Sequence, residues 1–328
     1  MRGSTGLKCL GGCLVGILAV ACLSACSIVG VGIYYRHRLN QYPVESKAVQ
    51  VDFDGHERSY RIYVPENLAE PAPLVFVIHG GGGDATGMEQ MTKTRFNELA
   101  DRDGFIVVYP QGIDNQWSDG RADDFRPESH QAGVDDVGYF NFMIDDVAAD
   151  YDVDEDHIFA TGISNGGFMS MRLACELSDR IAGVGIVTAQ MSVDLGKTCQ
   201  PSEPVKVLMM NGTDDPLVPY EGGHVEVFRR KRGAIWSVDE TVDFWVAQNG
   251  CDEVPLSERL PDEEDDGMRV ERRDYAGCVA GGEVVLYRVE GGGHTWPGGV
   301  QYLPSLIVGK ATQDMSGADE IWAFWMGE

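Results

Sequence analysis

The chain has 328 residues, of which 43% are hydrophobic, with 26 Lys and Arg against 52 Asp and Glu, and this length suits one large domain or two small ones. Its formal net charge of −26 repels phosphate backbones and argues against nucleic-acid binding as the main function. The apolar content is too high for a disordered chain, so the sequence predicts a folded protein with an acidic surface.

The amino-terminal segment differs in charge from everything that follows it. Residues 1–38 hold four basic and no acidic side chains, so they carry +4 and leave −30 for the rest of the chain. The 27 residues from Cys9 to Tyr35 contain no charged side chain, whereas about 20 suffice to span a bilayer as a helix. We therefore expect residues 1–44 to be an export signal or membrane anchor with a short tether, and residues 45–328 to be one folded domain.

Three alternatives describe how this segment is used. Leu23-Ser24-Ala25-Cys26 resembles the bacterial lipobox, in which the Cys receives diacylglycerol and becomes the first mature residue. Residues 27–35 remain apolar, which favours an uncleaved transmembrane anchor instead. Plain secretion after cleavage is the third. In each case the domain is exported to the periplasm or the outside, and any membrane contact is made through residues 9–35 or a lipid on Cys26.

The domain is predicted to open with an antiparallel hairpin and to continue as an α/β sheet. Residues 49–54 and 60–64 alternate apolar and polar side chains around an Asp54-Gly55 turn. Short uninterrupted apolar runs then predict strands buried on both faces of a mostly parallel sheet, over residues 74–78, 105–109, 157–161, 184–187, 205–210 and 284–289. Helical patterns on both faces of this sheet are predicted over residues 91–100, 139–149, 167–177, 241–247 and 318–325.

Four cysteines lie in the predicted domain, at Cys175, Cys199, Cys251 and Cys278. None forms a C-x-x-C pair and no His lies at zinc-ligand spacing from them, so we expect no metal site. Export permits disulfides, but four cysteines allow three pairings and their spacing does not choose among these.

A candidate nucleophile lies in Gly162-Ile163-Ser164-Asn165-Gly166, between a predicted strand and a predicted helix. G-x-S-x-G in that context is the nucleophile elbow, where a strained turn lifts the Ser oxygen out of the sheet. The string alone also fits a glycine-rich turn with an incidental Ser.

A glycine loop, His79-Gly80-Gly81-Gly82-Gly83, follows an early predicted strand. Amides of Gly80 and Gly81, with that of Asn165, are candidates for an oxyanion hole that stabilises a tetrahedral intermediate. A phosphate cradle would need G-K-[ST] after the glycines, but the chain continues Asp84-Ala85-Thr86.

A Ser nucleophile needs a general base and a carboxylate that orients this base. His294 is the candidate base, because it lies in a glycine-rich loop directly after a predicted strand. The carboxylate should follow a strand between Ser164 and His294 in the chain, where Asp214 and Asp215 are both suitable. The residue chemistry alone does not separate these two.

Seven motifs in this order, from about residue 58 to the carboxyl end, resemble the polyhydroxybutyrate depolymerase family of esterases, close to the feruloyl and acetylxylan esterases of carbohydrate esterase family 1. These are His79 with its glycines, Tyr109-Pro110-Gln111-Gly112, Trp117-Ser118-Asp119-Gly120-Arg121, Val134-Asp135-Asp136-Val137, the Ser164 elbow, Gly212-Thr213-Asp214-Asp215-Pro216 through Tyr220, and Gly292-Gly293-His294-Thr295-Trp296-Pro297-Gly298.

The resemblance implies an α/β-hydrolase fold with catalytic Ser164, Asp215 and His294. It also implies that Cys175 pairs with Cys199 and Cys251 with Cys278. Two features depart from the family pattern: Asn211 stands where His usually precedes Gly-Thr, and no polymer-binding domain follows the predicted catalytic domain. The resemblance therefore does not by itself imply attack on solid polyester.

Other conspicuous residues receive less specific interpretations. Trp117 and Trp296 could line an acyl or sugar pocket or pack in the core. Asp135 and Asp136 are expected to cap or brace a helix. The acidic run 262–266 reads as a solvated loop, since an EF-hand starting at Asp262 would have Arg273 where Glu is required.

The sequence thus predicts an exported serine esterase acting on hydroxyalkanoate oligomers or polyesters, or on feruloyl- or acetyl-type esters. We expect no cofactor and no obligate protein partner, with residues 113–133 and 221–238 selecting the ester substrate. Two alternatives remain: a serine peptidase on the same fold, and a catalytically inert surface binding protein.

Overall fold

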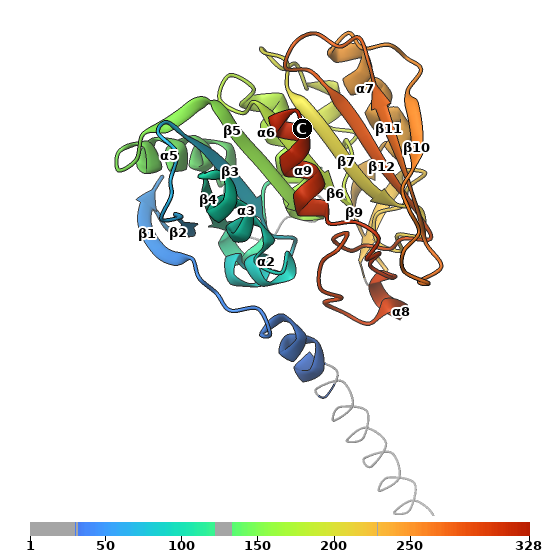
Figure 1. Ribbon diagram of the computed structural model, residues 1–328, viewed down its shortest axis with the longest axis horizontal. Coiled ribbons are helices and arrows are strands. Elements are labelled where there is room, and N and C mark those ends of the chain that lie inside the picture. Colours follow the sequence, from blue (N-terminus) through green and yellow to red (C-terminus); the bar gives the residue numbers. More distant parts are fainter. Residues whose placement is uncertain (1–29, 31, 122–132, 228) are drawn as a thin grey trace, which may run out of the picture.

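The computed structural model describes residues 30, 32–121, 133–227 and 229–328. Cys26 and most of the predicted anchor lie outside the described residues. No helix in these ranges is long and apolar enough to cross a bilayer. Residues 32–39 are helical and lead into the tether, and the rest of the described chain forms the domain in Figure 1.

A sheet of ten strands organises the domain, in the order β1-β2-β4-β3-β5-β6-β7-β12-β11-β10. The pairings from β4 through β12 are parallel, and both outer pairs of strands are antiparallel. The strands are β1 (Lys47–Phe53), β2 (His56–Tyr63), β3 (Ala72–Ile78), β4 (Ile106–Gln111), β5 (Val153–Ile163), β6 (Gly183–Val187), β7 (Lys206–Gly212), β10 (Leu256–Arg259), β11 (Arg269–Tyr275) and β12 (Val284–Glu290). The predicted amino-terminal hairpin and mostly parallel sheet are confirmed.

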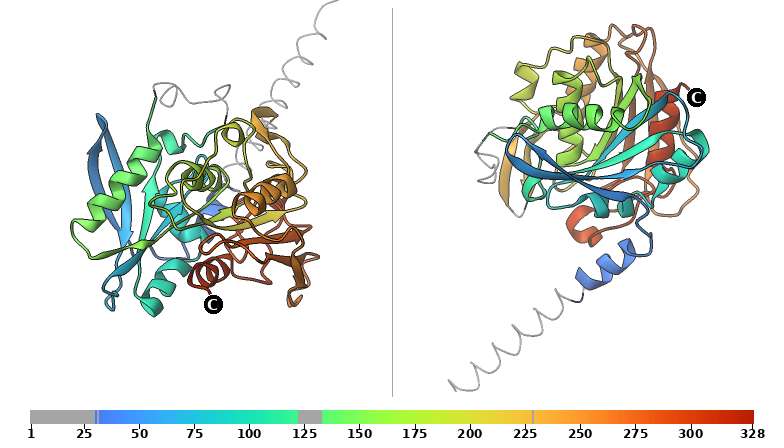
Figure 2. Two further views of the ribbon diagram at one scale, coloured as in Figure 1. Left: turned by 90° about the horizontal axis from the view of Figure 1, so that it is seen from above. Right: turned by 90° about the vertical axis from the view of Figure 1, so that its left-hand side faces the viewer.

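Helices cover both faces of this sheet, each over its own hydrophobic core (Figure 2). One face carries α5 (Asp136–Ala148), α6 (Asn165–Glu176) and α7 (Val238–Gln248). The other carries α2 (Ala85–Met91), α3 (Arg95–Asp103) and α9 (Gly317–Met326). The short elements are η1 (Ile113–Asn115), η3 (Leu195–Lys197), α8 (Ser305–Val308) and a separate hairpin of β8 (Gly223–Val227) and β9 (Arg230–Ile235).

The helix predicted over residues 91–100 is confirmed from Arg95 onward as α3, but its predicted start is wrong, because the chain turns between α2 and α3. Lys93 and Thr94 adopt left-handed φ values of 57° and 56°, which break the helical path. The Thr94 amide donates to the Glu89 carbonyl at 2.9 Å, and the Thr92 hydroxyl donates to the same carbonyl at 3.1 Å, so side chain and backbone together stabilise the turn.

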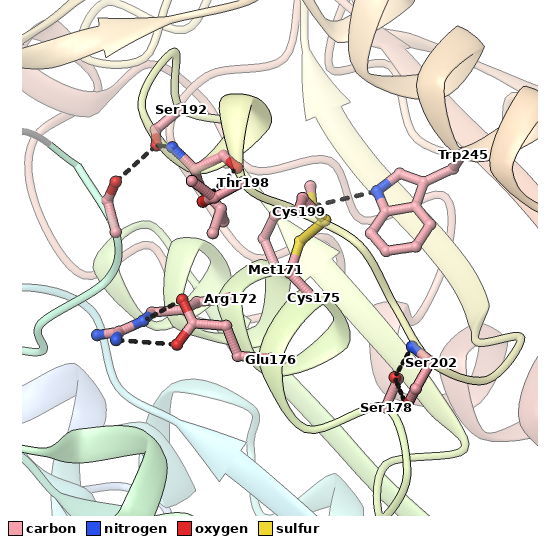
Figure 3. Close-up of a disulfide and its surroundings, with 12 residues drawn as sticks. Met171, Arg172, Cys175, Glu176, Ser178, Ser192, Thr198, Cys199, Ser202 and Trp245 are labelled. Atoms are coloured by element: carbon pink, nitrogen blue, oxygen red, sulfur yellow. Dashed lines mark hydrogen bonds and ion pairs between the residues drawn. A yellow bond between two sulfur atoms is a disulfide. The ribbon is translucent and has the colours of Figure 1, made fainter.

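Two disulfides are present, in the pairing that the resemblance implied. Cys175 of α6 bonds Cys199, before β7, and Cys251, after α7, bonds Cys278, before β12. Figure 3 shows the first bridge close to Met171, whose sulfur accepts a hydrogen bond from the Trp245 indole at 3.2 Å. The bridge therefore fixes the end of the helix that begins beside Ser164.

Candidate active site

Ser164 occupies the sharp turn between β5 and α6. Its backbone has φ 56° and ψ −121°, a strained conformation for a non-glycine residue. Its amide donates to the Val187 carbonyl of β6 at 2.9 Å. A Cβ on Gly162 would lie 2.5 Å from the Gly166 backbone, and one on Gly166 would collide with the Ile78 carbonyl, so this crossing of strand and helix requires both glycines.

The glycine loop after β3 lies against this turn. A Cβ on Gly80 would be 3.4 Å from that of Ser164. The Gly82 amide donates to the Asn115 carbonyl at 2.7 Å and the Gly83 amide to the Gly80 carbonyl at 3.0 Å. Within the described chain the Gly80 and Gly81 amides donate to no acceptor. The structure therefore leaves these two donors beside Ser164, where an oxyanion hole needs them.

His79 holds the glycine loop as a neutral imidazole. Burial lowers the pKa of His79 to about 4. The Gly112 amide donates to its Nε2 at 3.0 Å, so the proton lies on Nδ1, which donates to the Gly80 carbonyl at 2.8 Å. This side chain thus bridges β3, the glycine loop and the end of β4.

Asn165 connects the elbow to the loop around Trp117. Its Oδ1 accepts from the Trp117 amide at 2.8 Å, and its Nδ2 donates to Asp119 Oδ2 at 2.6 Å. The Trp117 indole in turn donates to the His79 carbonyl at 3.0 Å. The side chain of Asn165 therefore fixes the first turn of α6, where its own amide is a candidate oxyanion donor.

Asp215 and His294 form a buried pair, with Asp215 Oδ2 and His294 Nδ1 2.7 Å apart and side chains 2% and 3% exposed. The other carboxylate oxygen accepts from the amides of Leu217 and Val218, each at 2.8 Å, which fixes the plane of the carboxylate. Asp214 is exposed and its carboxylate accepts only a 3.3 Å bond from the Thr213 hydroxyl among the described residues. The structure thus places Asp215, and not Asp214, against the imidazole.

Ser164, Asp215 and His294 follow the carboxyl ends of β5, β7 and β12, which lie in one parallel part of the sheet. They therefore share one edge of it. Asp215 Oδ2 contacts His294 Nδ1, so Nε2 is the imidazole nitrogen that does not face this carboxylate. The structure shows no hydrogen bond between the described side chains of Ser164 and His294, and such bonds often form only once substrate is bound.

Tyr302 supports the His294 loop and has no signal in the sequence. Its hydroxyl donates to the His294 carbonyl at 3.1 Å, while the His294 amide donates to the Val308 carbonyl at 2.5 Å. Burial, followed by the nearby Asp215 carboxylate, raises the pKa of Tyr302, so the phenol remains a donor. These two hydrogen bonds hold the long loop that contains α8 against His294.

Trp117 and Trp296 are both buried in the hydrophobic core, which is one of the two roles expected for them. Trp117 is 4% exposed and packs against His79, with ring centroids 5.0 Å apart. Trp296 is 1% exposed and packs against Phe96 under α3. A pocket of about 500 Å³ lies between α3 and α9, and its lining includes Trp296 but not Ser164, Asp215 or His294.

Two other motif residues act as predicted. Asp135 caps α5 by accepting from the Gly138 amide at 2.8 Å. Asp136 is buried and accepts from Arg58 at 2.8 Å and from the Ser118 amide at 2.7 Å. The two residues therefore brace the loop that reaches Asn165.

Comparison with known proteins shows which family the chain belongs to. Residues 58–238 match the family described as Esterase PHB depolymerase. The chain is 32% identical over 303 residues to "Putative esterase NocK" of Nocardia uniformis subsp. tsuyamanensis, covering 87% of this chain and 86% of that protein. It is 32% identical over 226 residues to Feruloyl esterase B of Piromyces equi, covering 68% of this chain and 39% of that longer protein.

Among solved structures, an acetyl xylan esterase from Aspergillus awamori superposes with a TM-score of 0.55 at 18% identity, covering 76% of this chain and 94% of that one. At this identity the similarity concerns the fold. Together with the family match over residues 58–238, it supports the mostly parallel sheet with helices on both faces. The chain therefore belongs to the Esterase PHB depolymerase family and is a carboxylic ester hydrolase with an α/β-hydrolase fold.

Proposed function

We propose that the protein hydrolyses esters through an acyl-enzyme formed on Ser164, with His294 as general base and Asp215 as its orienting carboxylate. The observation that carries this proposal is the buried 2.7 Å pair of Asp215 and His294 at the sheet edge that also holds the strained Ser164 turn. An ionised carboxylate on Nδ1 keeps the proton there and frees Nε2 to accept another.

The first half-reaction transfers the acyl group to the protein. Ser164 Oγ attacks the ester carbonyl while its proton passes to His294 Nε2, and the carbonyl oxygen becomes an oxyanion facing the amides of Gly80, Gly81 and Asn165. The tetrahedral intermediate then collapses, His294 returns the proton to the departing alcohol oxygen, and the acyl-serine remains. No cofactor is required.

The second half-reaction regenerates Ser164. A water molecule gives a proton to His294 and attacks the acyl carbonyl, and the same amides stabilise the second oxyanion. Collapse releases the carboxylic acid, and the proton on His294 returns to Ser164 Oγ. Asp215 stabilises the imidazolium in both halves without accepting its proton.

The substrates are inferred from family and relatives. We infer hydroxyalkanoate oligomers or polyesters, or feruloyl- or acetyl-type esters, because the family match is to PHB depolymerase esterases and a relative is named a feruloyl esterase. Residues 113–133 and 221–238 are proposed to select among them. Residues 122–132 and residue 228 of these loops lie outside the described part of the chain.

Replacement of the proposed nucleophile tests the mechanism. Ser164→Ala should leave only the roughly 10³- to 10⁴-fold acceleration over water that binding and the oxyanion hole provide, measured by p-nitrophenyl acetate hydrolysis. A fluorophosphonate probe should label the wild type and not this variant. Ser257→Ala, at an exposed position in β10, is the matched control and should keep wild-type turnover.

The two alternative functions predict different results in this assay. An inert binding protein would remain unlabelled by the probe, and a peptidase would also cleave peptide anilides, with that activity lost in Ser164→Ala. Near-full turnover by Ser164→Ala would contradict the assignment of this nucleophile.

We also propose that the domain works outside the cytoplasm, tethered through residues 9–35 or a lipid on Cys26. The uncharged 27-residue segment and the two disulfides support this proposal.

A further inference from the structure

The β8–β9 hairpin carries the highest density of positive charge in a strongly acidic chain. Arg229, Arg230, Lys231 and Arg232 are consecutive, whereas the whole chain has a net charge of −26. Arg229, Arg230 and Lys231 are exposed, and Arg229 stands at the hairpin turn with a left-handed φ of 64°.

These exposed cations differ from the other arginines of the domain in lacking a carboxylate partner. Within the described chain, Arg229, Arg230 and Lys231 form no ion pair. Every described arginine between residues 58 and 288 outside the hairpin has a carboxylate oxygen within 3.9 Å, namely Arg58, Arg61, Arg95, Arg102, Arg121, Arg172, Arg180, Arg259, Arg269, Arg272, Arg273 and Arg288. The chain has twice as many acidic as basic residues. A group of exposed cations without ion-pair partners therefore produces a local positive potential on its surface.

The base of the hairpin is attached to the catalytic edge of the sheet. Ile235 forms a bridge with Ser192, in the loop that follows β6, and the Val193 amide donates to the Ala234 carbonyl at 3.0 Å. On the other strand, the Glu226 amide donates to the Leu217 carbonyl at 2.9 Å, two residues after Asp215. The two loops that hold the hairpin thus flank the strand ends of the proposed active site.

A second connection joins the hairpin to the nucleophile elbow. Arg121 donates to the Arg232 carbonyl at 3.3 Å, and its guanidinium pairs with Asp119, which also accepts the bond from Asn165. The same guanidinium lies 4.2 Å from the ring centroid of Phe168, in the first turn of α6. These contacts therefore connect β9 to the helix that begins beside Ser164.

Among the described residues, the acid that faces this group of cations across the hairpin does not pair with it. Glu226 stands opposite Lys231, but the two side chains form no ion pair. Burial, and then the neighbouring cations Arg121 and Arg230, lower the pKa of Arg232.

We propose that the β8–β9 hairpin is a subsite for a carboxylate carried by the ester substrate, so that the protein prefers anionic oligomeric esters to neutral ones. This proposal rests on the proposed function and assigns its substrate class. A strand rises about 3.4 Å per residue, so Arg230 lies roughly 17 Å along β9 from Ile235. The carboxylate must therefore be several units from the scissile ester.

Paired substrates isolate the contribution of the carboxylate. One arm compares a 3-hydroxybutyrate tetramer as free acid with its methyl ester, and the other compares acetylated xylo-oligosaccharides with and without a glucuronic acid substituent. The readout is the ratio of kcat/KM for the anionic and neutral members. In wild type this ratio should exceed one in at least one arm, at about 10 mM salt, and fall toward one at about 0.5 M salt because ions screen the attraction.

Charge reversal on the hairpin tests whether these residues cause the preference. We expect R229E/R230E/K231E to lower the ratio about tenfold, while Lys47→Glu, an exposed cation on β1, leaves it unchanged. R229Q/R230Q/K231Q should give an intermediate ratio and retains long side chains if the reversed variant folds poorly. The arm that shows the preference identifies whether the acid is a hydroxyalkanoate terminus or a uronic acid.

Failure of this proposal and failure of the proposed function give different results. Wild type that cleaves p-nitrophenyl acetate through Ser164 but has a ratio of one in both arms overturns the subsite alone. If no ester is cleaved, the binding of the same substrate pairs to wild type is measured by calorimetry. Equal affinity for the acid and neutral forms would then overturn the subsite. A preference for the anionic substrate that persists in both hairpin variants would also overturn it.

Discussion

At the scale of single residues, the choice between Asp214 and Asp215 depends on backbone direction. Both follow β7, and their chemistry is the same. The turn after β7 leaves Asp214 exposed and directs Asp215 toward the His294 imidazole, with the amides of Leu217 and Val218 on its second oxygen. Adjacent residues in an extended or turning chain point in different directions, so one of them is excluded from the site.

This difference makes the two aspartates a matched pair of variants. Asp215→Asn should lower kcat for p-nitrophenyl acetate by about 10⁴-fold, because the amide no longer holds the imidazole in the correct tautomer. Asp214→Asn should stay within about twofold of wild type. Equal losses in the two variants would contradict the assignment of Asp215.

His79 gives a pH dependence of stability with a defined sign. Its folded pKa of about 4 lies below the usual 6.5, so between these values the unfolded chain binds a proton that the native protein excludes. His79 therefore reduces the free energy of unfolding as pH falls, by about 2.5 kcal/mol between pH 7 and 4.5.

Urea unfolding at both pH values measures this effect. The loss of stability on acidification should be about 2.5 kcal/mol smaller in His79→Gln than in wild type, whatever the absolute stability of the variant. His56→Gln, an exposed histidine on β2, serves as the control. An identical loss in wild type and His79→Gln would show that the imidazole is not held neutral.

At the scale of elements, strands with an apolar run or a clear apolar–polar alternation were predictable, and exposed strands without either were not. The apolar runs that become β3, β6, β7 and β12 are covered on both faces, so their composition identifies them. All four residues of β10 are exposed, and its sequence shows no apolar pattern. The β8–β9 hairpin is charged for the same reason, because its outer surface faces solvent.

The first disulfide stabilises the element that carries the nucleophile turn. Cys175 and Cys199 are 24 residues apart, and closing a loop of this size is worth about 3 kcal/mol in the chain-entropy estimate. C175A/C199A should lose about this free energy of unfolding by urea titration while keeping esterase activity at low temperature. Reducing agent should destabilise wild type more than this variant, and equal sensitivity would contradict the pairing.

At the scale of the whole molecule, charge separates a basic amino end from an acidic domain. Residues 1–38 carry +4 and no acid, and the domain carries the excess of Asp and Glu. A basic segment with an uncharged apolar centre is typical of an export signal. The excess of acidic side chains in the domain favours its solubility.

Fractionation tests the proposed tether. Wild-type esterase activity should sediment with membranes, and deletion of residues 9–35 should move it to the soluble fraction because the apolar segment is lost. Cys26→Ala separates the alternatives: release of activity indicates lipidation, and retention indicates a transmembrane anchor. Soluble wild-type activity would contradict tethering altogether.

The sequence by itself determined the fold class, the Ser164 elbow, the glycine loop and the His294 loop, because strand and turn chemistry are local and the motifs occur in a fixed order. The family resemblance also implied Asp215, which residue chemistry alone did not separate from Asp214. Only the tertiary structure showed how Asp215 meets His294, that Trp117 and Trp296 are core residues, and that Arg229, Arg230 and Lys231 form no ion pair among the described residues. Each of these depends on which side chains from distant segments become neighbours, and this is set by packing across the sheet and not by residue type.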